Sequence, residues 1–259
     1  GLEVKQLIFE AGGALLFFFK TIRTLFRGGV EPYQVIRQIY AVGVQSVSAT
    51  VVTGMFVGAI MAMQINLQLR DFGAQAYLGG LTSSVTIRNV GPVLIAFILS
   101  GKVGAYTSAE LATMQVTDQI SAIRCLGTDP IRYLVLPRLL AVVISSAMLL
   151  MVGIMMTIGG GMLMASFQLG VNSLNYIQNI PGLVSWGSIS IGIIKSLVFG
   201  LLIGIIACYR GFHASRGSAG VGIAVKSTSV ATAVCIIAVD YLVSWWVSKL
   251  YFLMGWEII

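Results

Sequence analysis

The chain has 259 residues, of which 57% are hydrophobic and 10% charged, and its formal net charge is +7 at pH 7. A soluble domain carries about 25% charged residues, so this composition excludes an ordinary water-soluble domain and makes a lipid bilayer the solvent for most of the chain. In a bilayer the backbone forms either helices or a closed barrel, and barrel strands would alternate apolar and polar residues. The apolar residues here come in long continuous runs, which predicts an all-α integral membrane protein.

The excess of basic residues has a topological explanation. Sixteen Lys and Arg face nine Asp and Glu, and Lys and Arg accumulate on the cytoplasmic side of membrane proteins. The basic residues are scattered among apolar spans, which argues against nucleic-acid binding. The three cysteines have no metal-ligand spacing, so we expect neither a metal site nor a disulfide framework.

Residues 1–30 are predicted to form an amphipathic helix at the membrane interface. Lys20, Arg23 and Arg27 are spaced to share one helical face, and apolar residues cover much of the remainder. Such a helix lies in the plane of the headgroups. Residues 31–259 then form the membrane-spanning domain.

Five apolar stretches in this domain predict five transmembrane helices, because about 20 apolar residues cross a ~30 Å hydrocarbon core. Gly54 and Gly58 form a GxxxG pair that allows close helix contact in the first, and Pro92 is expected to kink the second. The predicted spans are residues 38–69, 82–112, 131–165, 188–209 and 228–253.

The basic residues near the helix ends predict the orientation of the chain. Residues 1–37, 113–138 and 210–227 together carry eleven Lys and Arg, whereas Arg70 stands alone at the opposite ends. The positive-inside rule therefore places the N-terminus in the cytoplasm and the C-terminus on the outer side.

The sequence contains no recognisable catalytic or nucleotide-binding motif. The glycine-rich segment 210–227 includes Lys226-Ser227, but a phosphate loop needs glycine directly before the lysine, and Val225 stands there. The only histidine, His213, has no predicted partner for acid–base chemistry. We expect this chain to be no enzyme, so that any ATP would be hydrolysed by a separate subunit.

Three of the charged residues within the predicted spans are candidates for a specific role. Lys195 in the fourth span and Asp240 in the fifth lie at similar depth when counted at 1.5 Å per residue. Because intramembrane charges are costly and usually paired, we expect a Lys195–Asp240 ion pair, with a role either in structure or in gating and proton movement. Arg88, near the outer end of the second span, is explained equally by snorkelling and by binding an anionic headgroup.

A polar segment follows the second span. Residues 117–127 read "TDQISAIRCLG" and place Ile120, Ile123 and Leu126 on part of one face. A short amphipathic helix between two spans suits docking into a groove of a partner protein. Gly127 is expected to end this helix in a left-handed conformation, and Asp129-Pro130 to begin the third span.

The stretch "RNVGPVLIAFILSGKVGAYTSAELATMQVTDQISAIRCLGTDPIRYLVLPR" (88–138) closely resembles the signature region of MlaE/YrbE permeases, the membrane subunits of MCE-type ABC lipid transporters. The resemblance continues through "VVTGMFVGAIMAMQ" (51–64) and "IKSLVFGLLIGIIACYRGF" (194–212). It departs at one position, because the family often has Arg-Glu before Leu-Gly-Pro, whereas Arg88-Asn89 precedes Val90-Gly91-Pro92 here.

This resemblance implies a homodimer of five-span subunits in the bacterial inner membrane, with an N-terminal elbow helix. It implies two cytoplasmic ATPase subunits that bind ATP and Mg²⁺, a periplasmic MCE-domain partner, and a role in the lipid asymmetry of the outer membrane. The segment 117–127 would be the coupling helix that binds the ATPase, through Asp118, Gln119, Ile120, Ile123, Arg124 and Leu126. A phospholipid cavity would lie between spans one, two and five, with Gln64, Ile65, Gln68, Leu69, Arg88 and Asn89 as lipid-binding positions.

Two other classes of function fit the composition. An ion-coupled secondary transporter would need ion sites and usually internal repeats with broken helices, and Asp240 is the one acidic residue predicted near mid-membrane. A non-transporting membrane scaffold would hold no lipid.

Overall fold

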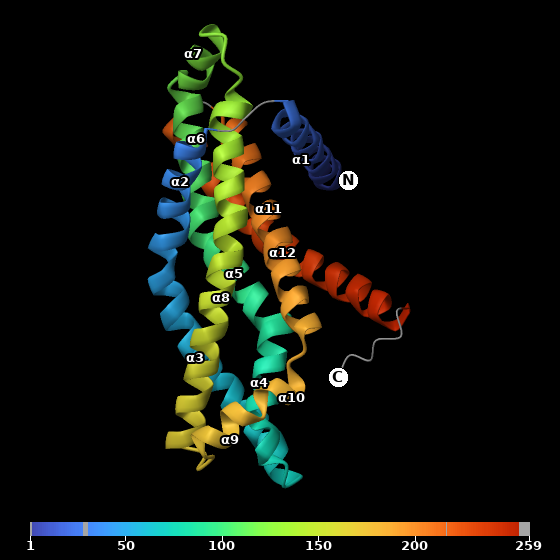
Figure 1. Ribbon diagram of the computed structural model, residues 1–259. Coiled ribbons are helices and arrows are strands. Elements are labelled where there is room, and N and C mark those ends of the chain that lie inside the picture. Colours follow the sequence, from blue (N-terminus) through green and yellow to red (C-terminus); the bar gives the residue numbers. More distant parts are fainter. Residues whose placement is uncertain (1, 28–30, 216, 254–259) are drawn as a thin grey trace. The chain divides into compact units, whose positions relative to one another are not determined.

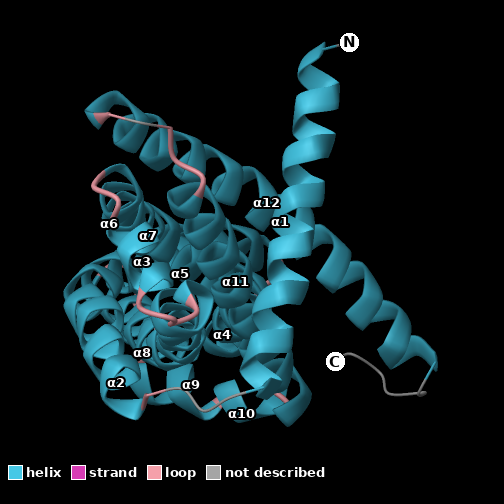
Figure 2. Ribbon diagram, turned by 90° about the horizontal axis from the view of Figure 1, so that it is seen from above, coloured by secondary structure: helices cyan, strands magenta, loops and turns pink. Residues whose placement is uncertain are grey.

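In the computed structural model, which describes residues 2–27, 31–215 and 217–253, the chain is helical along nearly its whole length. Short loops join the helices, and the described residues contain no strand (Figure 2). The prediction of an all-α protein is therefore confirmed. The end of the predicted interfacial segment, residues 28–30, and the C-terminal residues 254–259 lie outside the described residues.

Twelve α-helices are assigned along the described chain (Figure 1). A 3₁₀ turn at Gln75–Tyr77 and π-helical turns at Tyr40–Val44, Thr86–Val90, Ser100–Gly104 and Ile131–Val135 connect or interrupt them. The α-helices are α1 (Leu2–Arg27), α2 (Pro32–Ile39), α3 (Gln45–Asp71), α4 (Leu78–Val85), α5 (Gly91–Leu99), α6 (Ala105–Val116), α7 (Gln119–Cys125), α8 (Leu136–Phe167), α9 (Ser173–Gln178), α10 (Ile180–Leu183), α11 (Trp186–Phe212) and α12 (Ser218–Leu253).

Five continuous helical stretches are long and apolar enough to cross a membrane. The shortest has 27 residues and the longest 42, and each exceeds the ~20 residues that the hydrocarbon core requires. The five-span prediction is thereby confirmed. The stretches are Pro32–Asp71, Gln75–Val116, Ile131–Phe167, Trp186–Phe212 and Ser218–Val247.

Two prolines are accommodated by wide turns rather than by breaks. A proline inside a helix lacks one N–H donor, and its ring crowds the carbonyl four residues earlier. The N–H of Gly91, directly before Pro92, bonds to the carbonyl of Thr86. In the same way, the N–H of Leu136, directly before Pro137, bonds to the carbonyl of Ile131. Each bond closes a π-helical turn, which is a known cause of helix bending. The disturbance expected at Pro92 therefore takes the form of a widened turn within a continuous span.

The chain divides into two compact units, each made of three separate segments. Unit 1 comprises Gly1–Val44, Leu99–Ser145 and Gly200–Ile236, and unit 2 comprises Gln45–Ile98, Ser146–Phe199 and Ile237–Ile259. An apolar core in unit 1 takes side chains from α1, α6, α7, α11 and the turn Ile131–Val135. Its buried members are Phe17, Leu111, Ile120, Ile131, Leu134, Val135, Cys208 and Phe212.

Close backbone contact between α3 and α8 organises unit 2. A Cβ added at Gly58 would collide with the backbone of Thr157, and one added at Gly160 would collide with the backbone of Met55. Small residues let two membrane helices approach until their backbones touch. The close contact predicted for the GxxxG pair in the first span is confirmed at Gly58.

Two adjacent glycines of α8 give a matched test of this contact. We expect Gly160→Ala to destabilise the protein by about 1–3 kcal/mol, because the added methyl group meets the Met55 backbone, which cannot move aside. Gly159→Ala is the control, since nothing lies within 4 Å of its added Cβ. Thermal unfolding in detergent should show a lower Tm for Gly160→Ala only. Equal Tm values for the two variants would contradict the contact.

Candidate functional site

An apolar groove of about 480 Å³ opens in unit 2. It is formed by α3, by the second span from Asn89 to Ile98, and by α12. Its size lies within the roughly 300–1,000 Å³ typical of ligand pockets. The lining residues are Thr53, Asn89, Val90, Val93, Leu94, Phe97, Ile98 and Asp240.

The polar edge of this groove is a three-residue network around Lys195. The Nζ of Lys195 lies 2.9 Å from Oδ1 of Asp240 and donates to Oδ1 of Asn89 at 3.1 Å. The Lys195 side chain is 1% exposed, whereas that of Asp240 is 25% exposed. An ammonium group buried this deeply needs acceptors for its charge and its three donors. The two groove residues Asn89 and Asp240 therefore provide the partners that keep Lys195 inside unit 2.

Arg88 lies beside this network but binds a different partner. Its Nε donates to Oγ of Ser188 at the start of α11, at 2.9 Å, and its side chain is half-buried. Because Arg88 and Asn89 are consecutive residues of a π-helical turn, they contact two different positions of α11, Ser188 and Lys195. Asn89 lines the groove and Arg88 does not.

The four predicted lipid-binding positions at the end of α3 separate into two pairs. Gln64 and Gln68 are exposed, whereas Ile65 and Leu69 pack against a small core that contains Leu78, Ala165 and Tyr176. None of the four is among the groove-lining residues. The two glutamines are therefore free to meet solvent or ligand, and the two apolar residues fix the end of α3.

Tyr176 is the centre of that small core. It belongs to the short helix α9 and is fully buried. Burial raises the pKa of Tyr176 to about 12, because desolvation disfavours the phenolate. Tyr176 therefore stays neutral at any physiological pH and anchors the loop between the third and fourth spans.

The polar helix α7 is held by specific turn chemistry at both ends. Asp118 adopts a left-handed conformation (φ 56°), which Asp tolerates better than most residues, and its carboxylate does not cap the helix. At the other end Gly127 has φ 77°, as predicted. The N–H of Gly127 bonds to Arg124 and that of Thr128 to Ile123, the pattern of a Schellman motif.

The third span begins as predicted. Oδ1 of Asp129 accepts a hydrogen bond from the N–H of Ile131 at 3.0 Å, so Asp129 is the N-cap and Pro130 the first helical residue. With the Schellman motif before it, this cap leaves a short connection between α7 and the third span.

The six residues predicted to bind an ATPase divide between the two faces of α7. Ile120 is 1% exposed and belongs to the core of unit 1, and Ile123 packs against the same core. A helix of seven residues is unstable alone, so these contacts hold α7 in place. The outward face presents Asp118, Gln119, Arg124 and Leu126, all exposed.

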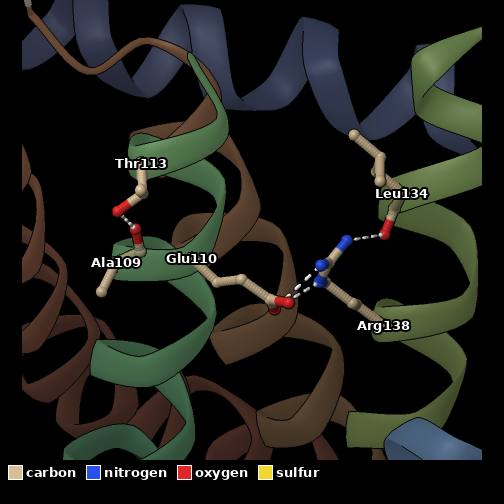
Figure 3. A network of polar contacts seen from close by, with 5 residues as sticks. All are labelled: Ala109, Glu110, Thr113, Leu134 and Arg138. Atoms are coloured by element: carbon tan, nitrogen blue, oxygen red, sulfur yellow. Dashed lines mark hydrogen bonds and ion pairs between the residues drawn. The ribbon is translucent and has the colours of Figure 1, made fainter. Parts of the chain in front are cut away.

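An ion pair that the sequence analysis did not anticipate joins the two helices that flank α7 (Figure 3). In unit 1, Nη2 of Arg138 lies 2.8 Å from Oε2 of Glu110, and Nη1 donates to the carbonyl of Leu134 at 2.9 Å. The Arg138 side chain is 7% exposed. Leu134 and Leu111, which adjoin these polar contacts, belong to the core that holds Ile120. The position of both charged residues near the ends of successive antiparallel spans is a signal that could have suggested the pair.

The described residues offer no evident metal centre. Within them, no group of three or more His, Cys, Asp and Glu side chains lies close enough to hold a metal ion. Among the described residues, Glu110 and Arg138 form an ion pair in unit 1, and Lys195 and Asp240 form another in unit 2.

The fold and the groove together define a class, an all-α membrane protein with five candidate spans. A family model described as "Permease MlaE" matches residues 35–246. The chain is 34% identical to a probable ABC transporter permease protein of Rickettsia felis. The 235 aligned residues make up 91% of each of the two chains. It is 30% identical over 210 residues, 81% of this chain and 80% of the relative, to the intermembrane phospholipid transport system permease protein MlaE of Haemophilus influenzae. The chain belongs to the MlaE permease family.

The Lys195–Asp240 pair can be measured by a double-mutant cycle. We expect Asp240→Leu to cost about 3 kcal/mol of folding free energy, the lower end of the range for breaking a buried pair, because Asp240 is partly exposed. Lys195→Met/Asp240→Leu should be more stable than Asp240→Leu alone, since no buried cation is left unpaired. Denaturation in detergent measures the folding free energy of the single variants and of the double variant, with the exposed Arg70→Met as a control. Additive losses from the two substitutions would show that the charges do not interact.

Proposed function

We propose that this chain is the membrane subunit of an ATP-driven transporter that moves phospholipid between the inner membrane and a periplasmic MCE-domain partner. The observation that carries the proposal is the apolar groove with one polar edge, because it matches the two chemistries of a phospholipid. Acyl chains suit the wall of Val93, Leu94 and Phe97, and a headgroup suits the edge at Asn89 and Asp240. The name of the Haemophilus influenzae relative, a phospholipid transport permease, supports this substrate class.

A second copy of the chain completes the proposed site. The groove is made by the first, second and fifth spans, which are the spans that the family resemblance assigns to the dimer axis. A homodimer would bring two such grooves to one twofold interface and enclose lipid away from the surrounding bilayer. The exposed Gln64 and Gln68 would then contact lipid at the mouth of the cavity.

The ATPase subunit binds the outward face of α7 in this proposal. Asp118 and Arg124 give that face both signs of charge, and Leu126 gives it an apolar contact that is 81% exposed. Charges around an apolar contact are typical of specific protein interfaces. ATP and Mg²⁺ would be held by the partner and not by this chain.

Force from the ATPase would travel through the core of unit 1. Ile120 is packed beside Leu134 and Leu111, and the Glu110–Arg138 pair joins the two spans that carry those residues. Packed side chains transmit displacement because interiors are dense and resist compression. A push on α7 would therefore move the ends of the second and third spans together, and the second span carries the groove wall.

The proposed location is the bacterial inner membrane, with the N-terminus and α7 in the cytoplasm and the C-terminus in the periplasm. The distribution of Lys and Arg supports this orientation, with eleven near one set of helix ends and one near the other. Lipid delivered to or taken from the periplasmic partner would contribute to lipid asymmetry of the outer membrane.

Filling the groove tests the substrate. We expect Val93→Trp to lower copurified phospholipid and ATP-dependent lipid transfer several-fold, because the indole occupies space within the groove. The ATPase subunit should still copurify. Met155→Trp, at an exposed site on α8 outside the groove, is the matched control. Lipid transfer that follows the proton gradient rather than ATP would favour a secondary transporter, and a wild-type protein without lipid would favour a scaffold.

Reversing charges on α7 tests the ATPase contact. We expect Asp118→Lys/Arg124→Glu to reduce copurification of the ATPase about tenfold or more, because both contacts become repulsive. Arg70→Glu/Asp71→Lys is a charge-matched control at exposed positions predicted on the opposite side of the membrane. Copurification and ATP hydrolysis are the two measurements. Unchanged assembly of the α7 variant would remove the proposed docking role.

A further inference from the structure

A second pocket, of about 390 Å³, lies in unit 1 and shares no residue with the groove. Its walls come from the start of the first span at α2, from α6 at the end of the second span, and from the turn Ile131–Val135 with the start of α8. Most of its lining residues are charged, amide-bearing or tyrosine side chains, whereas most of those of the groove are apolar. This lining suits a polar ligand better than an acyl chain.

The charges of this pocket separate into a closed pair and an open pair. Glu110 and Arg138 neutralise each other's charge in the ion pair described above. Arg37 is exposed, and its guanidinium makes no hydrogen bond or ion pair with the other described residues. The carboxylate of Glu31 accepts one hydrogen bond, from Nε2 of Gln34 at 2.7 Å, which leaves acceptor positions open. The pocket thus offers one available cation and one available anion.

Tyrosines complete the lining. Tyr33, Tyr106 and Tyr133 are 72%, 56% and 47% exposed, and all three line the pocket. Tyrosine is enriched where membrane helices meet the headgroup layer, because the ring is apolar and the hydroxyl is a donor. Hydroxyl donors and a guanidinium together are suited to a phosphate, and Arg binds phosphate with directed hydrogen bonds.

We propose that this pocket binds the phosphoethanolamine headgroup of a phospholipid from the membrane leaflet on the side of α7. Arg37 and the tyrosine hydroxyls would hold the phosphate, and Glu31 would accept hydrogen bonds from the ammonium. A zwitterion matches a site with one open charge of each sign. A quaternary choline has the same charge but no N–H donor, so Glu31 selects ethanolamine over choline.

The proposal extends the proposed function, because α7 and this leaflet are cytoplasmic only in the orientation given above. It assigns a headgroup site separate from the groove. A lipid held there would link α2 to the Glu110–Arg138 pair, since both line the pocket. Lipid binding would thereby connect the first span with the two spans that flank α7.

Native mass spectrometry of the intact transporter, titrated with lipids of one headgroup at a time, tests the site. The wild-type complex should retain phosphatidylethanolamine in preference to phosphatidylcholine and phosphatidylglycerol. Arg37→Gln should weaken retention of all three about tenfold, because the lost hydrogen bonds are to a charged phosphate. Glu31→Gln should lower phosphatidylethanolamine to the level of phosphatidylcholine and leave phosphatidylglycerol unchanged.

Arg70→Gln is the matched control, an exposed arginine at the end of α3 that lines neither the pocket nor the groove. Its lipid retention should equal that of the wild type. Unchanged retention in Arg37→Gln, or an unchanged ethanolamine preference in Glu31→Gln, would overturn the proposal. Displacement of the lipid by inorganic phosphate as readily as by free phosphoethanolamine would overturn the assignment to a zwitterion.

The same spectra separate this site from the groove. Val93→Trp should remove groove lipid and leave the headgroup preference of the wild type, whereas Arg37→Gln should leave groove lipid in place. If Val93→Trp had no effect on lipid while Arg37→Gln did, the proposed transport function would fail and the headgroup site would stand. Loss of both lipids in Arg37→Gln would show one shared site and overturn the proposal.

Discussion

The constraint on which the structure depends is that a bilayer offers no hydrogen-bond partners. Every backbone group must be satisfied within the chain, and helices do this locally. Several polar side chains of the spans follow the same rule. Thr86, Thr157 and Thr228 each donate to the carbonyl four residues earlier in their own span. These hydroxyls need no partner helix, so they place few demands on how the helices pack.

Buried charged side chains also need a counter-charge, which here comes from another helix, so they determine how the helices pack. Lys195 joins α11 to α12 and to the second span, and Arg138 joins the third span to the second. Each of these contacts joins residues at least 28 positions apart in the chain. Removing one partner strands a buried charge, so sliding or rotating either helix is costly. The ion pairs therefore fix the register of helices whose apolar faces alone would tolerate several alignments.

The sequence was sufficient wherever the deciding interaction is local. Apolar runs predicted the five spans, and the residues Gly127 and Asp129 predicted the turns that bound the connection after α7, because cap geometry depends on a few neighbouring residues. The positions of Lys195 and Asp240 suggested their pairing, since depth in a membrane can be counted along a helix.

The sequence was insufficient where helix rotation decides. Counting residues gives the depth of Glu110 and Arg138, which is compatible with an ion pair, but it does not give the directions in which the two side chains point. Ile120 carried the same apolar signal as Leu126, yet Ile120 is buried and Leu126 is 81% exposed. Val93, Leu94 and Phe97 line the groove. They are ordinary apolar residues of a span, so their residue types do not distinguish them from residues that face lipid or the core. They line a groove because α3 and α12 lie beside this part of the second span.

Asn89 shows how one substitution changes the charge balance at the groove. The family resemblance leads to an expectation of Glu at this position, which would place two carboxylates around the single ammonium of Lys195. Like charges that share a site disfavour ionisation of one member. With Asn89, the amide oxygen accepts from Lys195 at 3.1 Å while Asp240 supplies the one counter-charge. The network is therefore neutral as well as hydrogen-bonded, and no counter-charge from a ligand is needed to hold Lys195 in place. In the proposed function, a phospholipid headgroup at this edge would meet no net charge, and hydrogen bonds and dipoles would recognise it.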